Sequence, residues 1–125
     1  MEMKKGLTHT SLCEVKEENL ARTMGSGDLE VLATPAMVAL MENAAMLAVA
    51  PALPEGSTTV GALLNLTHSR PSGLGEKIEA TATLDEIEGR KLVFSVVARD
   101  SKGVIGEGSH IRYVVDREKF MSKVK

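Results

Sequence analysis

The sequence predicts a two-layer α+β domain in which a curved antiparallel sheet wraps around one long central helix. Three observations predict this fold class. Residues 35–50 are apolar on nearly every face of a helix, which is typical of a buried helix. From residue 58 onward, the pattern changes to an alternation of period two, as in half-buried strands. Tight turns such as Glu88–Gly89 separate the later strands, and short turns require antiparallel pairing.

A mildly strand-like segment at 10–16 begins the order of elements, and a short helical turn within 19–27 ends at glycines. The long helix begins at Thr34–Pro35, because threonine suits the N-cap and proline the first helical turn. It ends before Pro51 and Pro54.

Four strands follow, over residues 58–70, 76–88, 91–99 and 104–115. In the first of them, a regular alternation places His68 on the face of Val60, Ala62, Leu64 and Leu66, and Gly61 on the opposite face. The next two strands direct a regular set of apolar side chains inward: Ile78, Ala80, Ala82, Leu84, Leu92, Phe94, Val96 and Ala98. The charged last residues predict a short helix or a frayed end.

The composition excludes several classes of function. A chain of 125 residues suits a single domain over 1–125. Aromatic residues make up 2% of it, which disfavours proteins that stack nucleic-acid bases on aromatic side chains. A net charge of −2 disfavours both nucleic acid and an anionic membrane as partners. The single cysteine, Cys13, forms neither an internal disulfide nor a cysteine-rich metal site.

The chain also lacks the patterns of export and membrane insertion. The first residues, MEMKKG, precede no apolar run of the signal-peptide type. Glu42 and Asn43 interrupt the longest apolar stretch, 35–54, before it reaches the roughly 18 residues of a membrane span. We therefore expect a cytoplasmic protein without a membrane partner.

Three polar residues in apolar surroundings are candidates for chemistry. Glu42 lies in the middle of the apolar helix, where burial of a carboxylate calls for a partner or a raised pKa; the alternative is a narrow stripe that faces solvent or an interface. His68 ends an apolar strand face and is a candidate acid or base; the alternative is an ordinary core histidine. Thr34 is a candidate substrate contact, with a simple helix cap as the alternative.

The spacing of these residues constrains any shared site. Thr34 and Glu42 are eight residues apart, or roughly 12 Å along a helix axis. They therefore need a folded-back loop, a substrate that spans them, or a second protomer. Gly61 marks either a bulge or a backbone N–H donor for an oxyanion. Arg112 alternates with Ile111 and Tyr113 and reads as an exposed charge, whereas His9 and His110 carry no usable pattern.

Two segments of this sequence resemble the hot-dog thioesterases, and most closely the fluoroacetyl-CoA thioesterase-like group. They are ATPAMVALMENAA at 33–45 and TTVGALLNLTHSRPSGLGEKI at 58–78, within a resemblance that runs from about residue 8 to 115. The resemblance implies a hot-dog fold, with the family's catalytic threonine, glutamate and histidine on Thr34, Glu42 and His68. It also implies substrate-binding roles for Gly61 and Arg112.

The function that this resemblance implies is hydrolysis of an acyl-CoA thioester with no metal or bound cofactor. Glu42 would attack the carbonyl or activate a water, His68 would move protons, Thr34 would orient Glu42 or the carbonyl, and Gly61 would stabilise the oxyanion. The CoA phosphates would need cations, for which four candidates stay open: Arg70, Lys77, Arg90 and Arg99.

The low aromatic content predicts an aliphatic acyl pocket without fine selectivity for a fluorinated group. One alternative function is a non-catalytic protein that binds acyl-CoA or another small ligand. A second, a hot-dog dehydratase, fits the spacing less well. A single sheet and helix leave apolar edges uncovered, so we expect a homodimer with its pocket at the interface, and the pairing of dimers into tetramers stays open.

Overall fold

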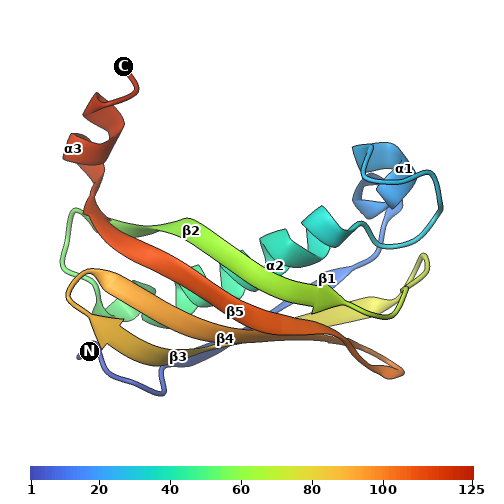
Figure 1. Cartoon of the computed structure of the whole chain (residues 1–125), viewed down its shortest axis with the longest axis horizontal. Coiled ribbons are helices and arrows are strands. Elements are labelled where there is room, and N and C mark those ends of the chain that lie inside the picture. The colour runs from blue at the N-terminus through green and yellow to red at the C-terminus, as the bar shows by residue number, and fades with distance from the viewer.

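The computed structural model describes Met1–Lys125 and consists of one five-stranded antiparallel sheet with a long helix against one face (Figure 1). The strand order is β1-β3-β4-β5-β2. The strands are β1 (Thr8–Glu14), β2 (Ser57–His68), β3 (Lys77–Glu88), β4 (Lys91–Asp100) and β5 (Gly103–Asp116). The helices are α1 (Ala21–Met24), α2 (Thr34–Val49) and α3 (Arg117–Ser122), with 3₁₀ turns η1 (Glu17–Asn19) and η2 (Ala50–Ala52). The predicted α+β fold class and order of elements are confirmed.

The core lies between α2 and the inner face of the sheet. Met37, Met41 and Ala45 of α2 are fully buried there, packed chiefly over β1 and β3. All eight side chains predicted to point inward from β3 and β4 are buried, and Phe94 is the one aromatic among them. The aliphatic composition thus produces an aliphatic core, whose burial is the main stabilising contribution.

The helical stretch Thr34–Ala52 has the length and the mean hydropathy, 1.3, of a membrane span. Its buried methionines and alanines instead pack on the sheet, as in the core helix of a folded domain. The apolar residues of α2 that face the sheet are therefore explained by this packing, whereas the expectation of a helix buried on nearly every face was only partly correct, since Leu47 on another face is 38% exposed.

Strand β2 contains a bulge that changes which residues face the helix. Gly61 pairs with Arg112, but Leu63 pairs with Ile111, so Ala62 is the extra residue. The prediction that Gly61 and His68 lie on opposite faces was therefore wrong. The bulge shifts the alternation by one residue and turns Gly61 toward the same inner face as His68, because their partners Arg112 and Gly106 share that face of β5.

Candidate active site

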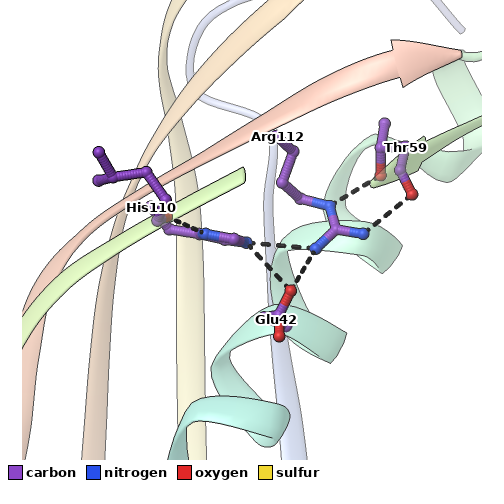
Figure 2. Close-up of polar contacts among 5 residues, drawn as sticks. Glu42, Thr59, His110 and Arg112 are labelled. Atoms are coloured by element: carbon purple, nitrogen blue, oxygen red, sulfur yellow. Dashed lines mark hydrogen bonds and ion pairs between the residues drawn. The ribbon is translucent and has the colours of Figure 1, made fainter. Parts of the chain in front are cut away.

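The carboxylate of Glu42 is the centre of a polar cluster between α2 and β5 (Figure 2). Glu42 Oε2 accepts a hydrogen bond from Arg112 Nη1 at 3.1 Å and lies 4.0 Å from His110 Nε2. The side chain of Glu42 is 37% exposed, so one edge of the carboxylate remains accessible. The predicted partner of this carboxylate is therefore Arg112, although the Glu42 side chain stays partly exposed.

Arg112 is held on three sides. Its Nε donates to Thr59 Oγ1 at 2.8 Å and its Nη2 to the Thr59 carbonyl at 3.0 Å, while Nη1 faces His110 Nε2 at 3.2 Å. Arg112 is buried, so the interpretation of this residue as an exposed charge was wrong. Burial lowers the pKa of the guanidinium, but arginine stays cationic in proteins. The cluster therefore fixes a positive charge against the Glu42 carboxylate.

Sequence reasoning missed His110, which is fully buried in this cluster. Its Nδ1 lies 2.8 Å from the Leu63 carbonyl, and burial lowers the pKa of the ring. The signal available in the sequence was its spacing of two from Arg112, since alternate residues of a strand share a face. Thr59 was also missed, because without the bulge the alternation in β2 assigns Thr59 to the opposite face of the sheet.

Gly61 lies directly against the Glu42 carboxylate. A Cβ at this position would overlap Glu42 Oε2 and lie 3.3 Å from its Cδ and 3.4 Å from Arg112 Nη1. Only glycine fits here without displacing the carboxylate. The backbone of β2 is thus brought within contact of the Glu42 carboxylate.

Thr34 and His68 form a second cluster. Thr34 Oγ1 and His68 Nδ1 are 2.8 Å apart. The prediction that Thr34 is the N-cap was wrong: Ala33 is the N-cap of α2, and Thr34 is its first helical residue. The hydroxyl is therefore directed to the histidine and not to the helix backbone. Burial lowers the pKa of His68, and its Nε2 is buried without a hydrogen-bond partner.

A cavity of about 270 Å³ adjoins this second cluster. Thr34, His68 and Arg70 contribute its polar lining together with two serines, and no aromatic side chain borders it. The full lining is Ala21, Ser26, Val31, Leu32, Thr34, His68, Ser69, Arg70 and Pro71. A neutral imidazole at the edge of such a cavity is suited to proton transfer.

Within one chain, Glu42 makes no hydrogen bond to Thr34 or His68. The helix separates Thr34 from Glu42 by more than two turns, as their spacing predicted. No three His, Cys, Asp or Glu side chains converge as metal ligands would. The chain therefore carries two half-sites, one with a carboxylate and a guanidinium and one with a hydroxyl and an imidazole.

Residues 15–118 match the model of a protein family described as fluoroacetyl-CoA-specific thioesterase. The chain belongs to this family. It is 42% identical over 96 residues to the fluoroacetyl-CoA thioesterase of Streptantibioticus cattleyicolor, covering 77% of this chain and 69% of that protein. The recognition of this family from the two sequence segments is confirmed, and the chain is a thioester hydrolase.

Solved structures of this family share the whole fold. A threonine-to-serine variant of fluoroacetyl-CoA thioesterase in complex with acetyl-CoA has a TM-score of 0.93 and 34% identity, over 98% of this chain and 96% of that one. A hot-dog-like protein from Thermanaerovibrio acidaminovorans has a TM-score of 0.87 and 25% identity, over 98% and 90% of the two chains. The hot-dog fold is thereby confirmed.

Proposed function

We propose that this protein hydrolyses acyl-CoA thioesters at a site formed by Glu42, Thr34 and His68, assisted by Gly61 and Arg112. The observation that carries the proposal is the position of the Glu42 carboxylate, fixed by Arg112 against Gly61, a strand position where a side chain would overlap that carboxylate. Membership of a thioesterase family supplies the reaction type, and a relative solved with acetyl-CoA supports a CoA thioester as substrate.

The chemistry divides between the two half-sites. The Glu42 carboxylate attacks the thioester carbon or deprotonates the water that does, while the Gly61 N–H faces the oxygen that becomes negative. Where Glu42 is the base, the carbon–sulfur bond breaks and the proton taken from the water passes through His68 to the CoA thiolate. Where Glu42 attacks, CoA leaves as the thiolate, and a water then hydrolyses the anhydride on Glu42 while His68 accepts the proton of that water and passes it to the thiolate. Thr34 fixes the orientation of the imidazole through its 2.8 Å contact.

We further propose that a homodimer unites the half-sites, the Glu42 of one protomer meeting the Thr34–His68 pair of its partner. Strand β2 is a sheet edge of 12 residues with Leu63 46% and Leu64 36% exposed, and long uncovered edge strands pair readily with another strand. If two copies of β2 pair antiparallel, the half of the strand that carries Gly61 in one copy runs alongside the half that carries His68 in the other, because the two strands run in opposite directions.

Arg70 is the best placed of the four candidate cations for the phosphates of CoA. It alone lines the cavity beside Thr34 and His68. The aliphatic and small residues of that lining support a short aliphatic acyl group as the substrate, with no aromatic side chain to select a fluorinated one.

Complementation between two inactive variants tests the proposal. Glu42→Ala and His68→Ala are each expected to release no measurable thiol from acetyl-, propionyl- or butyryl-CoA. Co-expressed in equal amounts they should recover about one quarter of wild-type activity, because half the dimers are mixed and each mixed dimer has one intact site. Mixing Glu42→Ala with Gly61→Ala, which alters the same half-site, is the matched control and should recover nothing.

The outcomes separate the parts of the proposal. A wild-type protein inactive on all three thioesters would overturn the substrate assignment. Full activity in Glu42→Ala would overturn the site. Two inactive variants that never complement would overturn the shared dimeric site and leave a site within one chain.

A further inference from the structure

The ring of His110 has both nitrogens engaged although it is fully buried. Nδ1 faces the Leu63 carbonyl, which only accepts, so Nδ1 must carry the hydrogen. Nε2 faces Arg112 Nη1 at 3.2 Å, which only donates, so Nε2 must present its lone pair. The two partners together define one state of the ring, a neutral imidazole with its hydrogen on Nδ1.

This state determines where the guanidinium of Arg112 points. Thr59 binds the edge that carries Nε and Nη2. The two hydrogens of Nη1 remain, and one is accepted by His110 while the other is accepted by Glu42. A buried N–H without an acceptor is costly, so the guanidinium rests where both are satisfied.

The bulge in β2 supplies the fixed point of this arrangement. Leu63 follows the bulged Ala62, and its carbonyl holds the His110 ring from the neighbouring strand. The ring of Phe94, 6.0 Å away between centroids, lies beside it on β4. The position of the Leu63 carbonyl therefore orients the His110 imidazole, the imidazole orients the Arg112 guanidinium, and the guanidinium positions the Glu42 carboxylate.

We propose that His110 is a positioning residue for the Glu42 carboxylate: as a neutral acceptor fixed by the Leu63 carbonyl, it orients Arg112 so that Nη1 holds Glu42 against Gly61. The inference deepens the proposed function, since it rests on the proposed role of Glu42. His110 contacts no substrate and acts only through Arg112.

The charges around the ring explain why protonation would disrupt this arrangement. The charged groups that face it are Arg112 from its own strand and Glu42 from α2; β4 and β2 contribute Phe94 and the Leu63 carbonyl. A hydrogen on Nε2 would place a donor and a cation against the guanidinium. It would also attract Glu42 from its present 4.0 Å and draw the carboxylate away from Arg112.

Two substitutions of opposite geometry test the proposal by activity. The amide of His110→Asn reaches the position of Nδ1 and keeps the bond to Leu63, but offers Arg112 no acceptor. The amide oxygen of His110→Gln reaches the position of Nε2 and keeps the acceptor, but loses the bond to Leu63. Steady-state kinetics should show kcat reduced by about 10- to 100-fold in His110→Asn and by less than about fivefold in His110→Gln, with little change in KM for either.

If His110 had only a structural role, the kcat values of the two variants would follow the order of their thermal stabilities. Equal kcat values, or the greater loss in His110→Gln, would therefore overturn the proposal. In a Glu42→Gln background, the difference between Asn and Gln at residue 110 should disappear, and a persisting difference would also overturn it.

A spectroscopic measurement on the wild-type protein tests the tautomer without reference to activity. Long-range ¹H–¹⁵N correlation spectra distinguish the two neutral tautomers from the cation for each of the three histidines. We expect the neutral Nδ1–H form for His110 at pH 7, and a hydrogen on Nε2 would overturn the proposal. Since this result does not need a substrate, failure of the proposed hydrolysis and failure of the positioning role are distinguishable.

Discussion

The two half-sites differ in how completely their hydrogen-bonding groups are used. Around Glu42, the guanidinium of Arg112 and the ring of His110 have a partner for every nitrogen. Around Thr34, His68 has a partner for Nδ1 only, and its buried Nε2 has none. A satisfied network holds a charge in place, whereas an unpaired nitrogen beside a cavity is available to a ligand.

The fully buried His110 and the half-buried His68 show the same contrast. Burial lowers the pKa of both rings, so both are neutral at neutral pH. His110 is fixed between a carbonyl and a cation, while His68 is anchored by one hydroxyl at the edge of the cavity. Neutral imidazole therefore serves orientation in one half-site and proton transfer in the other.

Removal of the charge in the satisfied cluster is expected to have the largest effect. Glu42→Gln preserves the shape of the side chain but removes the attacking or proton-accepting group, so kcat should fall by about 10³-fold or more. Thiol release from acetyl-CoA measures it. Glu107→Gln, which changes an exposed carboxylate on β5, is the control and should keep wild-type kcat. A Glu42→Gln enzyme within tenfold of wild type would contradict this role.

Displacement of the same carboxylate without removing it should have the next largest effect. Gly61→Ala places a methyl group where Glu42 Oε2 now lies, so either the strand or the carboxylate must move. We expect kcat to fall by about 100-fold, in line with the cost of misplacing a reacting group. The matched control is Gly73→Ala, where a methyl group meets no atom within 4 Å. Equal kinetics for the two alanine variants would show that the space beside Glu42 is not needed.

The fold was predictable because its signals are local. The apolar helix and the alternation of β3 and β4 are each encoded within one segment, and Thr34–Val49 begins and ends within one residue of the predicted helix. A bulge at Gly61 was one of the two interpretations of that strand glycine and is confirmed, but its effect on the faces of β2 was not predicted, because the alternation of side chains through β2 was taken as uninterrupted. A single extra residue therefore places both Thr59 and Gly61 on the inner face of the sheet, opposite to the face predicted for them.

The candidate site was predictable only where a family motif covers it. Thr34, Glu42 and His68 lie in the two segments that resemble the thioesterases. Arg112 was expected as a family position but interpreted as exposed, and His110 was passed over. The burial of both depends on α2 bringing Glu42 over β5, a tertiary contact that no pattern within β5 reports.

Substitutions in the second half-site should reduce kcat less, because the Thr34 hydroxyl contacts a neutral imidazole and not a charged group. Thr34→Val removes the partner of His68 Nδ1, and the kcat for thiol release should fall by about tenfold, whereas Thr34→Ser keeps the hydroxyl and should lose less.

The wild-type pH profile of kcat/KM should be flat down to below about pH 6.5, since the pKa values of both His68 and His110 are lowered. An acid limb above that pH would contradict a lowered pKa for these rings.

The same lowered pKa values give stability a pH dependence with a defined sign. Below about pH 6.5 the unfolded chain takes up protons on these two histidines that the folded chain does not, so the free energy of unfolding decreases as the pH falls toward their folded-state pKa values. Urea unfolding between pH 5 and 8 measures this slope. His110→Gln should reduce it by removing one of the two groups, and an unchanged slope would contradict a neutral His110.

The cation beside the open half-site should have the smallest effect, and only on binding. Arg70→Ala is expected to raise KM for acetyl-CoA by about three- to tenfold with kcat unchanged, because a charge that solvent still reaches contributes little more than about 1 kcal/mol to a phosphate contact. Acetyl-N-acetylcysteamine, a thioester without phosphates, should show no difference between wild type and variant. Arg99→Ala, which alters a candidate cation outside the cavity lining, is the control. If Arg99→Ala raises KM for acetyl-CoA and Arg70→Ala does not, the phosphates lie over β4, and the cavity beside His68 does not mark the path of CoA.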